Sequence, residues 1–405
     1  MPNTTLTADI IAKAAVAVLD NELVMGKKVF RGYEEDFAKK VNGYEVGETI
    51  TIRKPADFTV RNGAVASAQN VTEGKTTITV NKRRGIDFKF TAQELTLNIK
   101  DLSERVIKPA MVQLANDIDV ELHGLYKDVP NWVGTPGQVV NSFADFAKGP
   151  QRLDEGAVPQ DMRCAVLSPE DHWGMVGSQT ALFNDTINKP AYRQGQTGRI
   201  ANIDTYMTQN VATHTVGSDV SGTVNQSITA STITYDAVKD SMQQTITVAS
   251  LNLNPGDVFT IADVYDVNPV TKARLSFQKQ FTVVSYSSNT LVFYPAMIWT
   301  GAFKNVSVTP GVTDLNTKAI VAMGTAGGIY RQNMVFHQNA FALVTVPLVS
   351  PPGAVDVGRQ TYKGTSVRVI PVYDGINDES MWRLDVLFGV KAIDPRLATR
   401  LSGTS

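Results

Sequence analysis

Cysteine and long apolar runs are nearly absent from this chain of 405 residues. Cys164 is the only cysteine, so an intramolecular disulfide and a thiolate cluster for a metal are both excluded. Its apolar surroundings predict a buried, inert thiol. No run of about 18 apolar residues occurs, and no basic segment precedes an apolar stretch at the start, which argues against a membrane span and a secretion signal. We therefore expect a soluble protein with no membrane partner.

An excess of one charge sign is also missing. The 38 Lys and Arg residues balance the 39 Asp and Glu residues, which gives a formal net charge of -1. Nothing global therefore attracts the chain to nucleic acid or to anionic lipid. Because 405 residues exceed the roughly 250–300 at which a single core stops growing, two or more domains are expected.

Recognisable catalytic patterns are scarce as well. His123, His172, His214 and His337 are widely spaced, and no His-Glu-x-x-His pattern occurs, so structural histidines are favoured over metal ligands. The segment 324–328 is rich in glycine but lacks the Lys-Ser/Thr of a phosphate-binding loop. Gly-x-Ser-x-Gly is absent. The sequence predicts no catalytic residue, no metal site and no cofactor.

One long amphipathic helix is predicted over Asp101–Lys127. Its apolar residues recur with the 3.6-residue period of a helix. An interior proline at Pro109 removes a backbone donor, so we expect a kink or a fresh start there. Asp117 and Glu121 mark a polar flank, the apolar stripe is expected to pack on the subunit's own sheet, and Asp119 is expected to be solvated. The apolar residues of this stripe are Ile107, Met111, Leu114, Ile118, Leu122 and Leu125.

The N-terminal region is predicted to be an arm over residues 1–45. A polar tail precedes Thr7, which can cap a helix that carries one apolar stripe and stops near Gly26. The residues that follow are charged and rich in turn formers, so the stripe has no partner nearby in the sequence. We expect it to pack on a surface distant in sequence, either in the same subunit or in another one.

A projecting two-stranded flap is predicted over residues 46–90. Glu48–Arg53 and Lys75–Asn81 alternate as strands, and the loop Pro55–Gly74 between them has too few large apolar residues to form a core. The region is locally basic, which indicates either a solvated face or contact with an acidic patch on a neighbouring subunit. The residues proposed for such contacts are Arg61, Lys75, Lys82, Arg83 and Arg84 on the basic side and Glu34, Glu35 and Asp36 on the acidic side.

A mixed α/β domain is predicted on both sides of the long helix. Ile86–Phe90 reads as a strand, and Thr91–Glu94 as a capping box that opens a short helix. A helix is expected from Ser142 to Gly149-Pro150, followed by a strand over Met162–Leu167. The tetrapeptide Ser168–Asp171 is a strong helix start, because serine caps, proline takes the first position and two acids face the dipole.

A β-rich insertion is predicted over Val216–Thr313. Helical periodicity disappears there, Thr, Ser and Val predominate, and turn formers separate short strands, which is typical of a small barrel or sandwich. Afterwards Lys318–Met323 and Ala340–Val346 read as buried strands of the returning α/β domain. Thr365–Tyr373 and Met381–Ile393 form a hairpin that turns at residues 374–378.

This order of elements resembles the major coat proteins of tailed bacteriophages, and within them the branch of the Salmonella phage P22 coat protein. The resemblance implies an α+β, HK97-like (Hong Kong 97) capsid fold with an N-terminal arm, an extended β-hairpin loop, a long spine helix, peripheral and axial domains and an inserted β-barrel. The residues that carry it are Leu114–Asp117, Val120–Leu122, Ser168–Trp173, Phe183-Asn184, Ala191–Arg193, Gly195–Ile200, Val335–Ala340 and Trp382–Ala392.

The resemblance also implies how the chain divides. The spine helix and part of the peripheral domain would occupy residues 91–133, and the first part of the axial domain 134–215. The barrel would occupy 216–313, and axial and peripheral strands 314–405. These ranges follow the arm and the flap in chain order.

The implied function is that of a major capsid protein. It would self-assemble as a homo-oligomer into the hexamers and pentamers of an icosahedral shell, with a scaffolding protein and a portal protein. The shell would form in the host bacterial cytoplasm and enclose double-stranded DNA without sequence-specific binding. Two alternatives are an encapsulin-like compartment shell and an enzyme with an appended β-domain. The first is disfavoured by the large insertion, and the second rests only on size and mixed α/β character.

Overall fold

The computed structural model describes residues 8–34, 37, 40–41, 44–45, 48–61, 63–65, 68–91, 103–180, 199–351 and 357–404. The chain divides into two compact units. The first unit consists of Met1–Ile50, Thr77–His123 and Phe341–Lys391. The second unit consists of Thr51–Thr76, Gly124–Ala340 and Ala392–Ser405. The predicted N-terminal tail, the capping box after Thr91 and the short helix that follows it lie outside the described residues.

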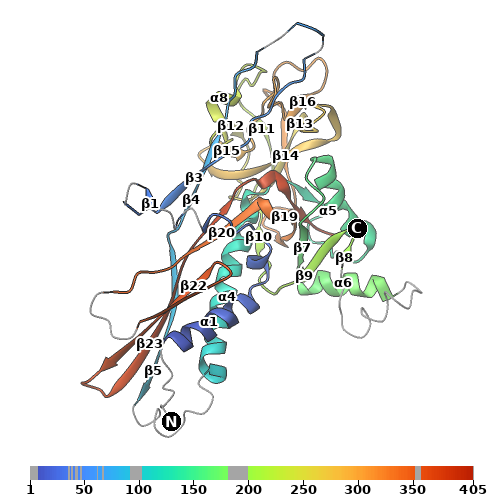
Figure 1. Ribbon diagram of the computed structural model, residues 1–405. Helices are drawn as coiled ribbons and strands as arrows, with labels where there is room; N and C mark the ends of the chain where they lie inside the picture. The colour runs from blue at the N-terminus through green and yellow to red at the C-terminus, as the bar shows by residue number, and fades with distance from the viewer. Residues whose placement is uncertain are drawn as a thin grey trace. The chain divides into compact units, whose positions relative to one another are not determined.

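The N-terminal helix α1 (Ala8–Glu22) packs within its own chain. Its stripe of Ile11, Ala15 and Leu19 is buried, and the helix contacts α4, β21 and β22 of the first unit. A 3-10 turn, η1 (Met25–Lys27), follows it. The prediction that this stripe packs on a surface distant in sequence is confirmed. The other option, a surface on another subunit, is wrong, because the sheet and spine helix of the same chain cover the stripe (Figure 1).

The predicted spine is helical, and its helix type changes twice along the chain. A π-helical segment, η2 (Ser103–Ile107), precedes α4 (Lys108–His123), and the 3-10 segment η3 (Gly124–Asp128) follows. Pro109 is the second residue of α4, where π-helical turns change to α-helical ones, so the α-helix begins next to the proline, in agreement with the predicted fresh start. The apolar stripe does not pack mainly on a sheet as predicted. Within the first unit, α4 lies chiefly against α1, because α1 fills the space between the spine and β21–β22.

Asp119 is a second correction on this helix. It was expected to be solvated, but its side chain is buried and accepts the amides of Val24 at 2.8 Å and Gly26 at 3.0 Å. A buried carboxylate that accepts backbone amides satisfies donors that would otherwise be orphaned at the start of the 3-10 turn η1. Burial raises the pKa of Asp119, and the hydrogen bonds from Val24 and Gly26 oppose that rise.

Long strands form the sheet of the first unit. The order is β20-β23-β22-β21, and β5 pairs with β23 along its outer part. Figure 1 shows β5, β22 and β23 running side by side. The predicted hairpin is confirmed, with the amide of Ile376 bonded to Asp374 in the turn, and the predicted strand at 86–90 is part of the longer β5. The bounds are β5 (Lys82–Thr91), β20 (Phe341–Val346), β21 (Gly358–Tyr362), β22 (Thr365–Asp374) and β23 (Glu379–Ala392).

The predicted flap is present as a paired ribbon. β3 (Thr49–Arg53) pairs with β4 (Lys75–Thr79), and residues 54–74 form the loop between them. Two shorter strands, β1 (Lys40–Val41) and β2 (Tyr44–Glu45), pair just before it.

The second unit contains a six-stranded sheet in the order β6-β24-β19-β7-β9-β8. Helix α6 (Pro169–Thr180) starts as predicted, since the amide of Asp171 bonds Ser168 Oγ at 3.2 Å. The bounds of the strands are β6 (Trp132–Val133), β7 (Arg163–Leu167), β8 (Arg199–Ile200), β9 (Ile203–Met207), β19 (Asn333–His337) and β24 (Ala398–Leu401). The smaller pair β10 (Thr213–Thr215) and β18 (Ile329–Arg331), and the 3-10 turns η4 (Gln338–Ala340) and η5 (Pro395–Leu397), complete this part.

Helix α5 (Phe143–Glu155) does not end at Gly149-Pro150 as predicted. Ser142 caps it, and it continues to Glu155 because Phe146, Pro150 and Leu153 share one buried face. A Cβ at Gly149 would lie 3.0 Å from Val335 Cγ2, so glycine lets the helix approach β19 closely. Burial of this face outweighs the hydrogen bond that the proline removes.

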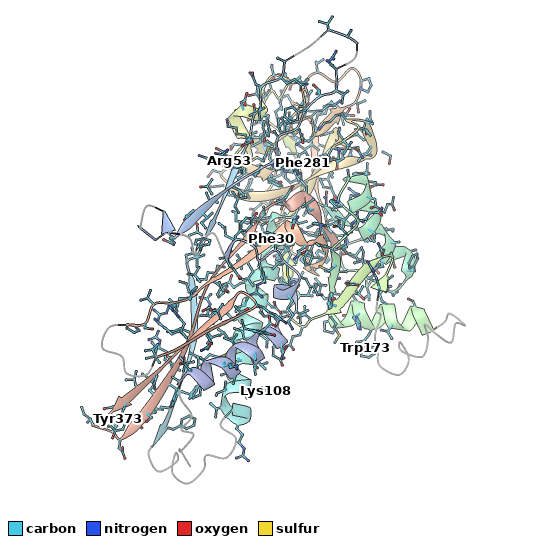
Figure 2. The ribbon with its side chains drawn as sticks, viewed as in Figure 1. Phe30, Arg53, Lys108, Trp173, Phe281 and Tyr373 are labelled. Atoms are coloured by element: carbon cyan, nitrogen blue, oxygen red, sulfur yellow. The ribbon has the colours of Figure 1, made fainter. Side chains whose placement is uncertain are left out.

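The insertion is a closed barrel. Its six strands pair in the ring β11-β12-β15-β14-β13-β17, and β16 extends the sheet beside β13. Phe259, Phe281 and Phe293 meet at its centre with ring centroids 5.1 to 5.5 Å apart. Phe281, which Figure 2 labels in the region of the barrel strands, is fully buried. The bounds are β11 (Ser221–Val224), α8 (Tyr235–Val238), β12 (Gln244–Ala249), β13 (Val258–Val267), β14 (Arg274–Ser287), β15 (Thr290–Tyr294), β16 (Val306–Val308) and β17 (Ala319–Ala322).

Strand β17 corrects one assignment. The segment 318–323 was predicted to belong to the returning α/β domain, but β17 lies between β11 and β13 and closes the barrel. Its apolar alternation alone does not distinguish a strand of the barrel from a strand of the returning α/β domain, because Ile320 would be buried in both.

Candidate functional sites: a buried junction and a projecting loop

The side chain of Arg400 on β24 is fully buried among neutral acceptors. Its Nε donates to the carbonyl of Val129 at 3.0 Å, and its Nη1 donates to the carbonyl of Gly256 at 2.7 Å. Nη2 lies 3.3 Å from Thr282 Oγ1. Burial lowers the pKa of Arg400 to about 9, and the nearby Tyr126 and Asp257 oppose that shift. One guanidinium therefore links the body strand β24, the segment after the spine helix, the turn before β13 and strand β14 of the barrel.

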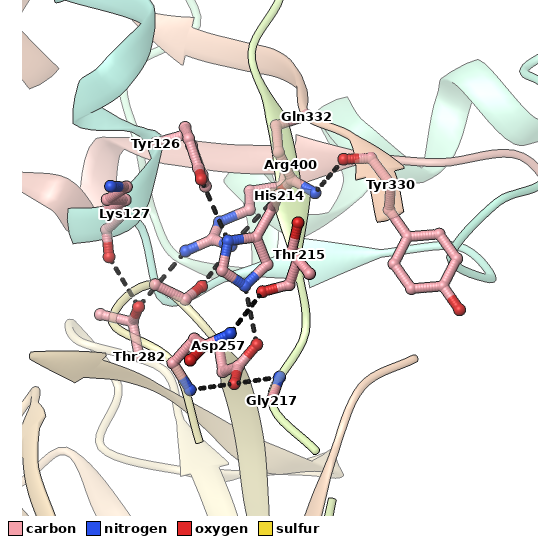
Figure 3. Close-up of polar contacts among 12 residues, drawn as sticks. Tyr126, Lys127, His214, Thr215, Gly217, Asp257, Thr282, Tyr330, Gln332 and Arg400 are labelled. Atoms are coloured by element: carbon pink, nitrogen blue, oxygen red, sulfur yellow. Dashed lines mark hydrogen bonds and ion pairs between the residues drawn. The ribbon is translucent and has the colours of Figure 1, made fainter. Parts of the chain in front are cut away.

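His214 forms the second part of this junction. Its Nδ1 lies 3.0 Å from Tyr126 Oη and its Nε2 lies 2.7 Å from Asp257 Oδ1 (Figure 3). The carboxylate of Asp257 also accepts the amides of Gly217 at 3.0 Å and Asn254 at 2.6 Å. This pattern assigns the Nε2 proton to the bond with Asp257, so the tyrosine hydroxyl donates to Nδ1.

The arrangement Tyr126–His214–Asp257 resembles the spacing of a catalytic triad, but its surroundings argue for a structural role. All three residues are buried, at 3%, 3% and 1% exposure, so a substrate has no access to the hydroxyl. Hydrogen bonds join His214, Asp257 and Arg400 to other parts of the chain. The junction is a rigid polar joint between barrel and body, which agrees with the prediction that His214 is structural.

Sequence reasoning did not find the other members of this junction. Tyr126, Asp257 and Arg400 come from three separate segments, and the bonds of Arg400 span as many as 271 residues. No local spacing brings such residues together. The segment Ala398–Leu401 gave no signal of its own, because two of its four residues, Thr399 and Arg400, are polar and do not form an apolar run.

Three residues proposed for intersubunit contacts are engaged within the first unit. Lys82 pairs with Glu121, and Arg84 pairs with both Asp117 and Glu121 at 2.8 Å, so strand β5 is tied to the polar flank of α4. Arg83 pairs with the buried Asp385 at 2.8 Å. These partners belong to the same chain.

Asp385 forms ion pairs with three arginine side chains. Arg368 Nη2 lies 2.6 Å from its Oδ2 and Arg383 Nε lies 3.0 Å away, in addition to Arg83. Burial acts to raise the pKa of Asp385, but the hydrogen bonds from Arg368, Arg83 and Arg383 outweigh it, so the pKa is lowered. This cluster ties β5, β22 and β23 together.

Of the three acidic residues predicted to contact the basic flap, Glu34 alone lies within the described residues. Its carboxylate lies 3.4 Å from Arg31 Nε, and burial raises its pKa to about 7 against the opposing effect of Arg31. Glu35 and Asp36 lie outside the described residues. The intersubunit role of this patch stays a prediction.

The projecting loop between β3 and β4 exposes apolar side chains. Val60 is 99% exposed and Val65 is 86% exposed, and Phe58 and Val71 are more than half exposed. Arg61 Nη1 donates to the carbonyls of Gly63 and Val65, which shapes the tip of the loop. The backbone amide of Lys75 bonds Asp240 at 2.9 Å. The described residues of the loop therefore form no core of their own, as predicted, and they present apolar surface outward.

Metal sites and membrane helices are not found where the structure is described. In these ranges no group of three or more His, Cys, Asp or Glu side chains is placed to hold a metal ion. No described helix is long and apolar enough to cross a membrane.

Comparison with known proteins decides the family. The profile of the family described as P22 coat protein, gene protein 5, matches residues 2–403. The chain belongs to the P22 coat protein family. A relative from this comparison is the major capsid protein of Acyrthosiphon pisum secondary endosymbiont phage 1, which is 21% identical over 98% of this chain and 97% of the relative. As a member of this family, the chain is a phage major capsid protein.

A solved structure with a TM-score of 0.50 supports the fold. A structure from Mycobacterium phage Che8 is similar with a TM-score of 0.50 and 12% identity, covering 93% of this chain and 90% of that one. The capsid structure of cyanophage P-SCSP1u gives a TM-score of 0.44 and 10% identity, over 89% of this chain and 84% of that one. The predicted α+β, HK97-like capsid fold with an inserted barrel is confirmed. The family match confirms the predicted resemblance to the major coat proteins of tailed bacteriophages and to their P22 branch.

Proposed function

We propose that copies of this chain form the hexamers and pentamers of an icosahedral shell that encloses the double-stranded DNA of a tailed phage. Membership of the P22 coat protein family over residues 2–403 is the observation that carries this proposal. The proposed assembly takes place in the cytoplasm of a host bacterium, with a scaffolding protein and a portal ring. A net charge of -1 suits a wall that surrounds DNA without gripping its sequence.

The projecting loop supports contact with a neighbouring copy. Its exposed side chains at Val60 and Val65 have no cover within the described part of the chain. Full burial of a valine side chain contributes roughly 1.5 kcal/mol or more, so covering both by a second copy would help to hold subunits together. Arg61 lies on this loop and Lys75 lies at its base, where β4 begins, and both remain our candidates for charge contacts with that copy.

Electron microscopy of the purified full chain, with and without a scaffolding protein, tests the proposal. We expect closed shells or tubular polymers. The double variant Val60→Ser with Val65→Ser should stay folded by circular dichroism but lose most assembly. Val270→Ser is the matched control, because Val270 is also exposed, at 76%, but lies on a barrel turn.

Deletion of residues 61–74 is a harsher form of the same test and should abolish shells. A small, uniform oligomer of the unaltered chain under every condition would contradict the proposal. Double-stranded DNA recovered from native particles distinguishes a phage shell from a cargo compartment.

A further inference from the structure

Asp240 of the barrel bonds both legs at the base of the projecting loop. The backbone amide of Lys75, where β4 begins, donates to Asp240 Oδ1 at 2.9 Å. From the other leg, Lys54 Nζ donates to the backbone carbonyl of Asp240 at 3.0 Å. The two legs also bond each other, because the amide of Lys54 donates to the carbonyl of Gly74 at 2.7 Å. Asp240 thus contacts both legs at the point where they leave the ribbon.

Gly74 allows the loop to approach the barrel this closely. A Cβ at Gly74 would lie 2.3 Å from the carbonyl oxygen of Lys239 and 3.3 Å from Tyr235 Oη. Backbone is the obstacle at 2.3 Å, so any larger residue would push the leg away. Tyr235 is itself fixed, because its ring stacks on Phe303 with centroids 3.4 Å apart. The barrel surface formed by Lys239 and Tyr235 therefore leaves space for only a glycine at position 74.

A second contact lies further out along the loop. Lys272 Nζ, on the turn between β13 and β14, lies 3.7 Å from Asp57 Oδ2. This pair is partly exposed and contributes little alone. Together with Asp240, it attaches the loop to the barrel at two separate points, which restricts the direction in which the loop projects.

We propose that the insertion barrel sets the direction of the projecting loop, and that Asp240 is the positioning residue. The inference rests on the proposed function, in which the loop reaches a neighbouring copy. A loop held in its binding direction loses less conformational entropy on contact than a free one. Asp240 is exposed and lies outside the apolar core of the barrel, so its role is to place the loop rather than to stabilise the barrel.

Hydrogen exchange of the unassembled full chain tests this placement. Asp240→Ala should raise the exchange rate at the Lys75 amide by about two- to tenfold, which corresponds to the loss of one exposed hydrogen bond. Gly74→Ala should have at least the same effect. Asp240→Asn keeps an acceptor oxygen and should restore slow exchange, whereas Asp236→Ala, an exposed carboxylate on α8, is the control and should change nothing.

Protection of the barrel strands serves as the internal reference. It should stay unchanged in every variant, and equal exchange at Lys75 in Asp240→Ala and the unaltered chain would overturn the inference.

Assembly of the same variants separates this inference from the proposed function. We expect Asp240→Ala and Gly74→Ala to assemble about three- to tenfold more slowly than the unaltered chain, with Asp240→Asn close to normal. Normal assembly of Asp240→Ala would overturn the positioning role while the shell proposal stands. If the unaltered chain itself forms no shell, the shell proposal fails, and the exchange data still decide whether Asp240 holds the loop.

Discussion

The barrel and the projecting loop are built from similar strands but reach opposite degrees of burial. β12 contains Thr245-Ile-Thr-Val248 and β3 contains Thr49-Ile-Thr-Ile52. In β12 every second residue is fully buried, whereas no residue of β3 is. The difference arises from neighbours, because five other strands close around β12 and only β4 accompanies β3. Alternation therefore predicts a strand but not whether its apolar face finds cover.

This contrast separates a self-sufficient part of the chain from a dependent one. The barrel fills its own interior with aromatic and aliphatic side chains from all of its strands. The loop is fixed at its base by a few polar contacts and leaves Val60 and Val65 in solvent. A loop without a core of its own keeps one orientation only if contacts with another part of the protein hold it.

The largest expected effect concerns where the barrel ends. A fragment of residues 216–323 should fold alone, because it includes β17 and the complete ring. A fragment ending at Thr313, the predicted boundary, lacks β17 and should not fold cooperatively, since β11 and β13 each lose a partner. Circular dichroism and urea unfolding of the two fragments make the comparison. A cooperative transition in the shorter fragment would show that the ring need not close.

A pair of phenylalanine substitutions gives the next largest effect. Phe281→Ala removes a fully buried ring from the barrel core and should lower the free energy of unfolding by about 3–5 kcal/mol. Phe58→Ala, on the loop at 57% exposure, should change it by less than about 0.5 kcal/mol. Urea denaturation of the full chain measures both. Similar losses would remove the distinction between the two regions.

The pH dependence of the free energy of unfolding gives a smaller expected effect, which arises outside the barrel. His123 on α4 is fully buried, neither ring nitrogen has a hydrogen-bond partner within the described structure, and burial lowers its pKa to about 4. The unfolded state therefore binds the proton first, so this contribution to stability is present above about pH 6.5 and is lost as the pH falls toward 4. Between pH 7 and 5 the loss is about 2 kcal/mol.

Variants isolate that contribution. The stability difference between His123→Leu and the unaltered chain should shift by this amount between pH 7 and 5. Glu34→Gln should shift in the opposite direction, because burial raises the folded pKa of Glu34 to about 7 and the folded state then binds its proton first. The barrel fragment 216–323 contains no histidine and should show no histidine-dependent step. An unchanged difference for His123→Leu would mean that its ring is not buried in solution.

Local features of the fold could be predicted, and long-range ones could not. The start of α6 followed from Ser168–Asp171 because a cap is made by neighbouring residues. The two legs of the loop and the hairpin β22–β23 followed from alternation and turn residues. The junction around Arg400 did not, since its acceptors lie 68 to 271 residues away. The candidate contact residues Lys82, Arg83 and Arg84 were assigned by charge alone, and charge does not reveal that partners exist within the same chain.

Errors in the prediction share one cause. The end of α5 was placed at Gly149-Pro150 by propensity, but the buried face of that helix outweighs the proline. Asp119 was assigned to solvent by type, but it accepts amides at the end of α1. In each case a tertiary contact decided against the local preference.

The place of β24 in its sheet has a consequence for the order of events during synthesis. β24 lies between β6 and β19, although it is made after every other strand of that sheet. The ribosome releases all strands of the barrel well before residue 398, so the barrel is complete while the sheet beside it still lacks an interior strand. For that interval β19 has an open edge, which is the kind of surface that chaperones protect and that promotes aggregation. The nascent chain is therefore most vulnerable late in translation, after its inserted domain has folded and before its body has.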